Sequence, residues 1–324
     1  MKDRTHPIYR YIFGPPAILL ILFLCWAEAV HPIQIGDRTI LGLWLLPLLL
    51  LVGWIGIQET LRLMRRIDSD PPSAIVYFFG TLILLAPFFL PYSFLFPKPS
   101  GGSFFSVFLL SIFGVIGVIL AQMWRYPGPE SRGATLRGIT GGVFAIIYVP
   151  LLLSFTTFIL LVPRMGISVL CGMILLVKTG DMGAYFVGRL LGKKGTDGLP
   201  KHPMSPILSP KKSMEGLCGA IVVPVLVAGI FLAILPQFSS LEKALFEIFP
   251  YGRITQYVLL CVSAAMLGLV GMLGDLAESL LKREAGVKDS SEWLPGFGGV
   301  LDMIDSVLFA APITYAVLYV LSHR

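Results

Sequence analysis

The sequence contains few charged residues and few cysteines, and each shortage excludes a class of protein. Charged residues make up 14% of the 324 residues and hydrophobic residues 56%, which is not the composition of a soluble globular domain. The four cysteines lie in apolar stretches without CxxC spacing, so neither a disulfide framework nor a zinc site is expected at Cys25, Cys171, Cys218 and Cys261. We also find no internal repeat of the kind that many transporters carry. The composition therefore predicts an all-α polytopic membrane protein.

Apolar windows predict about nine transmembrane helices. A helix needs about 20 mostly apolar residues to cross roughly 30 Å of hydrocarbon. Such windows lie at 12–30, 39–57, 74–96, 104–124, 139–162, 167–190, 217–238, 254–281 and 300–322. The basic connection 58–73 between two of them is interpreted either as an amphipathic segment in the headgroup layer or as a solvated linker.

The basic residues alternate between the successive connections and predict an orientation. One set of alternate connections holds 18 Lys and Arg residues and the other set holds six, and Lys178 lies within a window. Because cytoplasmic loops are enriched in Lys and Arg, we expect a cytoplasmic N-terminus and a C-terminus outside. One compact chain without a transit segment is most consistent with the inner membrane of a bacterium.

The chain divides into two regions of different character. Residues 1–166, with the first five windows, are almost free of charge in the middle of each window and read as a transmembrane scaffold. Residues 167–324 carry acids at helix ends and two long basic cytoplasmic loops, 191–216 and 282–299. We therefore expect the catalytic site in residues 167–324.

The acids of this second region converge on one membrane face. Ionisable residues at membrane depth are costly and are functional candidates by default. With the predicted orientation, the window that holds Asp181 and the window that holds Asp275 and Glu278 both end near these acids at the cytoplasmic boundary, where Asp302 and Asp305 begin the last window. Glu278 is also open to a purely interfacial interpretation. The convergence predicts a single polar site built from three helix ends.

Asp302 and Asp305 are three residues apart and therefore share one face of a helix. Two carboxylates held that close disfavour each other's charge unless a cation lies between them. Carboxylates are hard oxygen ligands that suit Mg²⁺, which also bridges to substrate phosphates. A simple capping role is the structural alternative for each aspartate.

Two cytoplasmic motifs resemble those of the phosphatidate cytidylyltransferase family, also called CDP-diglyceride synthases. The first covers the last loop and the start of the last window, with matches at Ser279, Lys282, Arg283, Lys288, Asp289, Ser291, Leu294, Pro295, Gly298, Gly299, Asp302 and Asp305. The second covers the GDMGAYFVGRLLGKK run and the SPKKSMEG run, with matches at Asp181, Ala184, Tyr185, Gly188, Arg189, Gly192, Lys193, Ser209, Pro210, Lys211, Lys212, Ser213, Glu215 and Gly216. Two positions depart from the family pattern: Phe297 replaces its usual histidine and Met303 its usual arginine.

The resemblance implies an enzyme that joins CTP to phosphatidate, giving CDP-diacylglycerol and pyrophosphate with Mg²⁺, and a second cation is left open. It assigns metal binding to Asp275, Asp302 and Asp305, with Asp181 as a weaker fourth ligand, and catalytic roles to these three acids with Lys282 and Arg283. Substrate binding is then expected at Asp181, Arg189, Lys193, Ser209, Lys211, Lys212, Ser213, Lys288, Asp289, Gly298 and Gly299. We expect membrane lipids as further partners and no nucleic acid, and we leave a homodimer open.

Three other functions stay open at this point. A related enzyme can use CTP with a different acceptor, such as an isoprenoid lipid or a polyprenol. An ion-coupled transporter also binds cations through acids, but those acids usually lie near the membrane midplane. A non-catalytic relative is compatible with the departures at Phe297 and Met303.

Overall fold

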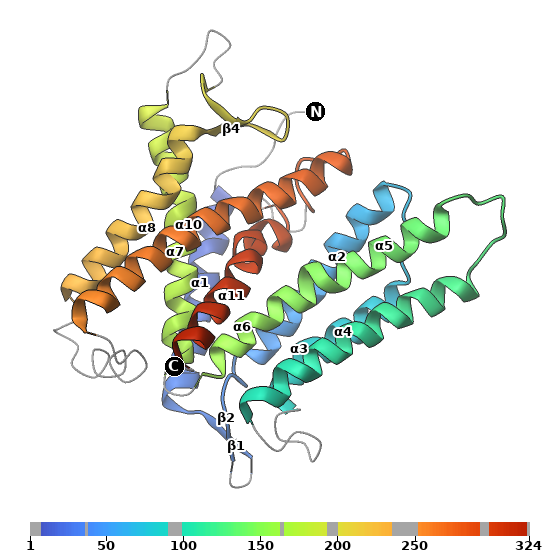
Figure 1. Ribbon diagram of the computed structural model, residues 1–324, viewed down its shortest axis with the longest axis horizontal. Coiled ribbons are helices and arrows are strands. Elements are labelled where there is room, and N and C mark those ends of the chain that lie inside the picture. The colour runs from blue at the N-terminus through green and yellow to red at the C-terminus, as the bar shows by residue number, and fades with distance from the viewer. Residues whose placement is uncertain are drawn as a thin grey trace. The chain divides into compact units, whose positions relative to one another are not determined.

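The computed structural model describes residues 8–35, 38–89, 99–162, 165–192, 200–234, 252–291 and 298–322 (Figure 1). Within these ranges seven helices are long and apolar enough to cross a membrane: Leu46–Arg66, Phe104–Trp124, Ala134–Leu160, Gly166–Leu191, Met214–Ile234, Ile254–Glu284 and Val300–Val320. Two shorter apolar helices, Leu19–Val30 and Ser73–Phe89, occupy the first and third predicted windows. The prediction of an all-α polytopic membrane protein is confirmed at this level. Nine full spans and the orientation stay predictions.

The chain forms two compact units, which we describe separately. The first consists of residues 1–161 together with 281–304, and the second of residues 162–280 together with 305–324. The assignment of residues 1–166 as a scaffold and 167–324 as the catalytic region stays a prediction. The helices α10 (Arg253–Glu284) and α11 (Val300–Ser322) each contribute residues to both units.

The first unit is a bundle of apolar helices. Its elements before residue 162 are α1 (Ile8–Val30), the hairpin β1 (Ile33–Ile35) and β2 (Arg38–Ile40), α2 (Leu46–Arg66), α3 (Ser73–Phe89), α4 (Pro99–Trp124), α5 (Ala134–Ile146), the π-helix η2 (Ile147–Leu151) and α6 (Leu152–Leu160). Figure 1 shows α2, α3, α4 and α5 side by side, and each packs against its neighbours. The π-helix contains Pro150, which has no backbone N–H to donate and therefore interrupts the regular α-helical hydrogen bonds.

The predicted window 39–57 is wrong at both ends. Strand β2 occupies its first residues, and α2 begins only at Leu46, with a proline in its first turn. The helix then continues to Arg66, through most of the connection 58–73. Leu61 and Leu63 in this part are almost fully buried, so it is not a solvated linker, and its place in the headgroup layer stays a prediction. The basic residues of this part predicted a connection, but the helix continues because one of its faces is buried.

The second unit is built around close helix contacts. Its elements are α7 (Gly166–Leu191), the hairpin β3 (Pro203–Ser205) and β4 (Ser209–Ser213), α8 (Met214–Ile234), most of α10 and the later part of α11. A Cβ added at Gly183 of α7 would lie 2.5 Å from the carbonyl oxygen of Gly219 in α8, and one added at Gly268 of α10 only 1.9 Å from that of Ala220. Small residues therefore let these backbones approach directly, as is common between helices in membranes.

The SPKKS segment forms a strand instead of an irregular loop. Strand β4 pairs antiparallel with β3 and leads directly into α8, whose start lies beside the hairpin in Figure 1. The hydroxyl of Ser213 accepts a hydrogen bond of 3.0 Å from the amide of Gly216, so Ser213 caps α8. The hairpin thus holds Lys211 and Lys212 immediately before the helix begins.

Candidate functional site

Three carboxylates of the second unit meet in one place. Asp275 and Glu278 come from α10 and Asp305 comes from α11, and one oxygen of each lies within 4.8 Å of the others. Glu278 is 1% exposed and Asp305 is 3% exposed. Asp275 and Glu278 are three residues apart, so both point from the same face of α10. We call these three residues the acidic cluster.

A glycine allows the two helices to approach closely enough to form the acidic cluster. A Cβ added at Gly274 would lie 2.6 Å from the carbonyl oxygen of Asp305 and 3.1 Å from the Cα of Ser306. Gly271, one turn earlier, faces Val177 of α7 and Ser306 of α11. Only a residue without a side chain fits at position 274, next to Asp275 of the acidic cluster.

Gly274→Ala is therefore expected to lower activity at least about tenfold. An alanine in a helix interior normally stabilises by about 1 kcal/mol relative to glycine. Here the new methyl group meets backbone atoms that cannot rotate away, so α10 and α11 must separate. The matched control is Gly229→Ala in α8, where an added Cβ meets no atom within 4 Å. Equal activity in the two variants, measured as product formed per amount of folded protein, would contradict this role of Gly274.

Asp181 is connected to the acidic cluster through a serine. The hydroxyl of Ser306 lies 3.0 Å from Oδ1 of Asp305 and 3.4 Å from Oδ2 of Asp181, and can donate to either. The amide of Ser306 donates to the same Asp305 oxygen. Asp181 also accepts a hydrogen bond of 3.1 Å from Lys178. Asp181 is thus placed one serine away from the acidic cluster.

The hairpin supplies a positive charge to the acidic cluster. Nζ of Lys212 lies 2.8 Å from Oδ2 of Asp275, and the Lys212 side chain is 19% exposed. The neighbouring Lys211 is exposed, as is Arg189 at the end of α7, which donates to the hydroxyl of Tyr185 at 3.0 Å. Ser209 is half-buried in β4. One lysine therefore contacts the acids, while other predicted substrate-binding cations point to solvent.

Asp302 makes its contacts within the first unit. Nζ of Lys282 donates a hydrogen bond of 2.5 Å to Oδ1 of Asp302, and the two side chains form an ion pair. Its Oδ2 accepts three hydrogen bonds, from the amide of Ser290 at 3.0 Å, the hydroxyl of Ser290 at 2.6 Å and the amide of Gly299 at 2.8 Å. Asp302 thereby holds Ser290 and Gly299, which both precede α11. The prediction that Asp302 also binds a metal stays a prediction.

Paired glycines make room for this network. Gly298 has a φ of +82°, a conformation that glycine adopts readily, and a Cβ there would lie 2.8 Å from Oδ2 of Asp302. A Cβ at Gly299 would lie 1.9 Å from the hydroxyl of Ser290 and 2.4 Å from Oε2 of Glu59. Any larger residue at either position would overlap Asp302, or Ser290 and Glu59. This packing explains the two glycines without the substrate-binding role that was predicted for them.

The remaining predicted site residues lie at the surface or outside the described ranges. Arg283 is exposed in the last turn of α10, and Lys288 and Asp289 are exposed after its end. Lys193 and the divergent Phe297 lie outside the described residues. Met303, the other divergent position, is 39% exposed on α11.

Sequence reasoning missed three residues of these networks and left a fourth open. Glu278 was interpreted as either interfacial or functional, and the structure places it in the acidic cluster. Ser290 and Ser306 are common residue types without a pattern of their own. Glu59 was assigned to a connection, although an acid followed by a Leu-rich stretch is itself a signal of a buried charge in a membrane helix.

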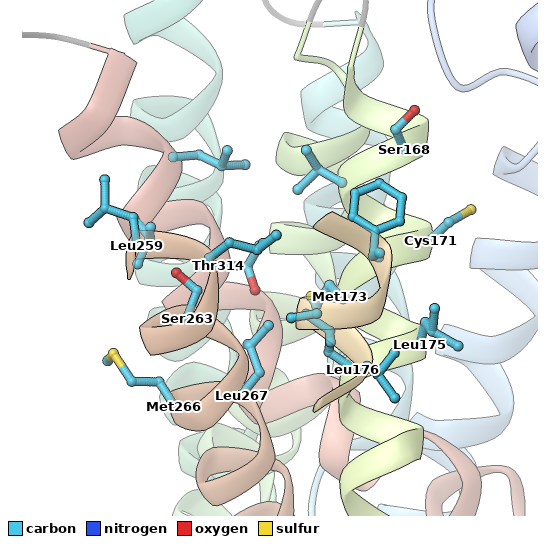
Figure 2. Close-up of a pocket in the computed structure, with 18 of the residues that line it drawn as sticks. Ser168, Cys171, Met173, Leu175, Leu176, Leu259, Ser263, Met266, Leu267 and Thr314 are labelled. Atoms are coloured by element: carbon cyan, nitrogen blue, oxygen red, sulfur yellow. The ribbon is translucent and has the colours of Figure 1, made fainter. Parts of the chain in front are cut away.

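An apolar cavity of about 420 Å³ lies within the second unit (Figure 2). It is lined by α7, α8, α10 and α11, and its labelled residues include Met173, Leu176, Met266 and Leu267. Along α10, Leu267 precedes Asp275 by eight residues, or about 12 Å of helix rise. The cavity and the acidic cluster therefore share the same helices at different depths.

The donor set of the acidic cluster fits a hard divalent cation. Three carboxylates within 4.8 Å repel one another, and Lys212 supplies only one positive charge beside them. Carboxylate oxygens are the ligands that Mg²⁺ prefers, and it usually takes one or two of them and completes its shell with water and phosphate oxygens. Asp275, Glu278 and Asp305 would hold such an ion.

Comparison with known proteins gives consistent matches. The sequence model of the family described as "Cytidylyltransferase family" matches residues 18–321. A protein of Bacillus subtilis named "Phosphatidate cytidylyltransferase" is 30% identical over 273 residues, which are 84% of this chain and 87% of that protein. A protein of the same name from Mycobacterium bovis is 33% identical over 67% of this chain and 68% of its own length, and one from Haemophilus influenzae is 38% identical over 49% of each.

Proposed function

Since this chain belongs to the cytidylyltransferase family, we infer that it is a phosphatidate cytidylyltransferase, which converts CTP and phosphatidate to CDP-diacylglycerol and pyrophosphate. The observation that supports this most strongly within the molecule is the buried acidic cluster beside Lys212. The carboxylates can bind a divalent metal ion, and the lysine can bind the oxygens of a polyphosphate. The two predicted family motifs contribute members of this arrangement.

We propose that the reaction proceeds by in-line displacement. A phosphate oxygen of phosphatidate attacks the α-phosphorus of CTP, the new P–O bond forms, and the bond to the β-phosphate breaks to release pyrophosphate. The attacking oxygen needs no general base, because the second pKa of a phosphate monoester is about 6 and the group is largely dianionic at neutral pH. The work of the protein is then to position two anions and neutralise their charge.

We propose roles for named residues in that work. Asp275, Glu278 and Asp305 would hold Mg²⁺, and the predictions for Asp302, Asp181 and a second cation are retained. Bound there, the ion would neutralise phosphate oxygens and polarise the reacting phosphoryl group. Lys212 is placed to exchange its contact with Asp275 for a phosphate oxygen, since a lysine is a mobile point charge. The exposed cations Lys211, Arg189, Arg283 and Lys288 are proposed to attract the triphosphate.

The membrane arrangement is part of the same proposal. We propose nine spans, a cytoplasmic N-terminus and an outer C-terminus in the inner membrane of a bacterium. This arrangement puts the acids of α7, α10 and α11 at the cytoplasmic face, where CTP is available. Residues 1–166 would then act as a scaffold and 167–324 as the catalytic region, with the reservation that residues 281–304 pack with the first unit.

We propose that the apolar cavity receives an acyl chain of phosphatidate. It is lined by α10 and α11, which carry the acidic cluster, and by α7 and α8, and its lining is almost entirely apolar. A chain anchored by its phosphate near Asp275 would reach residues such as Leu267 about 12 Å along α10. Burial of methylene groups is worth about 0.8 kcal/mol each, so several would contribute to binding.

Gly172→Leu is expected to raise the KM for long-chain phosphatidate several-fold. Gly172 lines the cavity, and an added Cβ meets no atom within 4 Å, so a leucine side chain starts in open space and would take up room in the cavity. The KM for a short-chain, dihexanoyl phosphatidate should change little, because its chains do not reach this depth. Gly229→Leu in α8 is the matched control, since its Cβ is equally free and it does not line the cavity. The same rise for both lipids, or for both variants, would exclude the cavity as an acyl-chain site.

The inferred reaction is tested by adding labelled CTP to the purified protein in lipid nanodiscs, with and without Mg²⁺. The acceptors should include phosphatidate, diacylglycerol, an isoprenoid phosphate and a polyprenol. We expect CDP-diacylglycerol and pyrophosphate from phosphatidate only, and no product when Mg²⁺ is chelated. Product from another acceptor alone would assign the chain to a different CTP-dependent reaction. CTP binding without any product would favour a non-catalytic relative.

A further inference from the structure

Glu59 is a buried acid of the first unit that the proposed reaction does not use. It lies on α2, seven residues before the helix ends at Arg66, and is 1% exposed. A carboxylate in such a place is unfavourable unless it is well hydrogen-bonded. Its position therefore calls for strong partners, and the structure shows three.

Two of the partners are the first residues of α11, and the third is Ser290, which precedes the helix. Oε2 of Glu59 accepts hydrogen bonds from the amide of Leu301 at 2.7 Å and from the hydroxyl of Ser290 at 3.1 Å. Oε1 accepts one from the amide of Val300 at 3.2 Å. Ser290 is 231 positions away from Glu59 in the sequence, so this contact is purely tertiary.

These contacts complete the start of α11. The first amides of a helix have no partner within the helix, and they favour negative charge. In α11 the amide of Gly299 donates to Asp302, and the next two amides, of Val300 and Leu301, donate to Glu59. Two carboxylates, one from the helix itself and one from α2, therefore fix its first turn.

The hydroxyl of Ser290 joins Glu59 to the Lys282–Asp302 pair. That hydroxyl lies 2.6 Å from Oδ2 of Asp302 and 3.1 Å from Oε2 of Glu59, so its one hydrogen is shared between two carboxylates. Asp302 in turn holds Lys282. The absence of a side chain at Gly299 is what leaves space for this arrangement, since a Cβ there would overlap both Ser290 and Glu59.

We propose that Glu59 is a positioning residue for the cytidylyl transfer, which fixes the first turn of α11 and Ser290 and thereby sets the orientation of Lys282 and Asp302. This inference rests on the proposed function. Glu59 does not touch substrate in this role. It acts through the backbone amides and the serine that it holds.

The test compares Glu59→Gln with Glu28→Gln in the full-length protein in nanodiscs. Glu28 is the matched control, because it is also a buried glutamate of the first unit, 2% exposed, and its oxygen accepts from the amide of Trp44 rather than from α11. Glutamine at position 59 can still accept at one oxygen, but its NH₂ group cannot accept from the remaining donors. We expect kcat to fall about 10- to 100-fold in Glu59→Gln, with a change of less than about threefold in the KM for CTP, as is typical for a residue that supports a site.

Amide hydrogen exchange provides a readout that does not depend on activity. We expect exchange over residues 299–302 to be at least about tenfold faster in Glu59→Gln and unchanged in Glu28→Gln. A loss of thermal stability that is the same in both variants, with unchanged kcat and exchange in Glu59→Gln, would overturn the proposal. If Glu59→Gln does not accumulate in the membrane, Ser290→Ala removes the shared hydroxyl alone, and full kcat with normal exchange in that variant would overturn it as well.

The outcome is separable from that of the proposed function. If the wild-type protein forms no CDP-lipid, the function fails. If the wild type is active and kcat of Glu59→Gln equals that of the wild type, only the role of Glu59 fails. Combining Glu59→Gln with Ser290→Ala should give no larger loss than the greater single loss, because both changes break one network.

Discussion

Asp305→Asn is expected to reduce CDP-lipid formation at least about 100-fold, the effect typical of removing one preorganised charged group from an active site. The variant replaces a carboxylate that is 3% exposed in the acidic cluster with a neutral amide. The remaining activity should need more Mg²⁺, so the Mg²⁺ concentration for half-maximal rate should rise. Both quantities are measured by titrating Mg²⁺ at saturating CTP.

The stability of the same variant should change in the opposite direction. With Mg²⁺ chelated, Asp305→Asn relieves repulsion among three close carboxylates, so its melting temperature should equal or exceed that of the wild type. Glu278→Gln is expected to behave in the same way. The control is Glu284→Gln, which changes an exposed acid near the end of α10. Normal activity in Asp305→Asn, or an equal loss in Glu284→Gln, would exclude the acidic cluster as the metal site.

Asp302→Asn is expected to abolish product formation and also to destabilise the protein. Asp302 and Lys282 are 14% and 12% exposed and form a close ion pair, and removing one partner of a buried pair costs about 3–5 kcal/mol. The variant also weakens an oxygen that accepts from Ser290 and Gly299. Lys282→Met should lower the melting temperature by a similar amount.

A double variant separates the structural role of the pair from its chemical role. Asp302→Leu combined with Lys282→Met removes both charges, and such replacements often restore stability. If the pair serves the reaction, the double variant should melt higher than either single variant and still form no product. Activity that returns together with stability would show that the pair is only structural, and the metal-ligand prediction for Asp302 would be withdrawn.

Much of the fold could be predicted from the sequence because the apolar windows are a local property. Eight windows meet helices whose ends lie within a few residues of the prediction, or next to undescribed residues. The window 39–57 failed because apolar residues also occur in strand β2 and in the turn after it, and hydropathy does not distinguish these from a helix.

The candidate site could be predicted in part for a different reason. Asp275, Asp305 and Lys212 were selected because orientation and family motifs put them at one membrane face, and the structure brings these three together. Glu278 could not be assigned, because helical spacing shows that it shares a face with Asp275 but not what that face meets. That face meets α11, because Gly274 has no side chain and so lets α10 approach the backbone of Asp305.

The sequence alone determined that the chain lies in a membrane and that it carries the motifs of a cytidylyltransferase, since these follow from composition, order and spacing. The expectation that its acids lie at helix ends was wrong for two of them, because Asp181 and Asp275 lie ten and nine residues before the ends of α7 and α10. Only the tertiary structure decided which acids share a site and which hold the protein together. Asp302 and Asp305 are one turn apart on α11, yet the first bonds to Lys282 and Ser290, while an oxygen of the second lies within 4.8 Å of oxygens of Asp275 and Glu278. The reason is that a hydrogen bond is short and directional, and the partner that satisfies a buried carboxylate is set by packing. For Glu59 that partner lies 231 residues further along the chain.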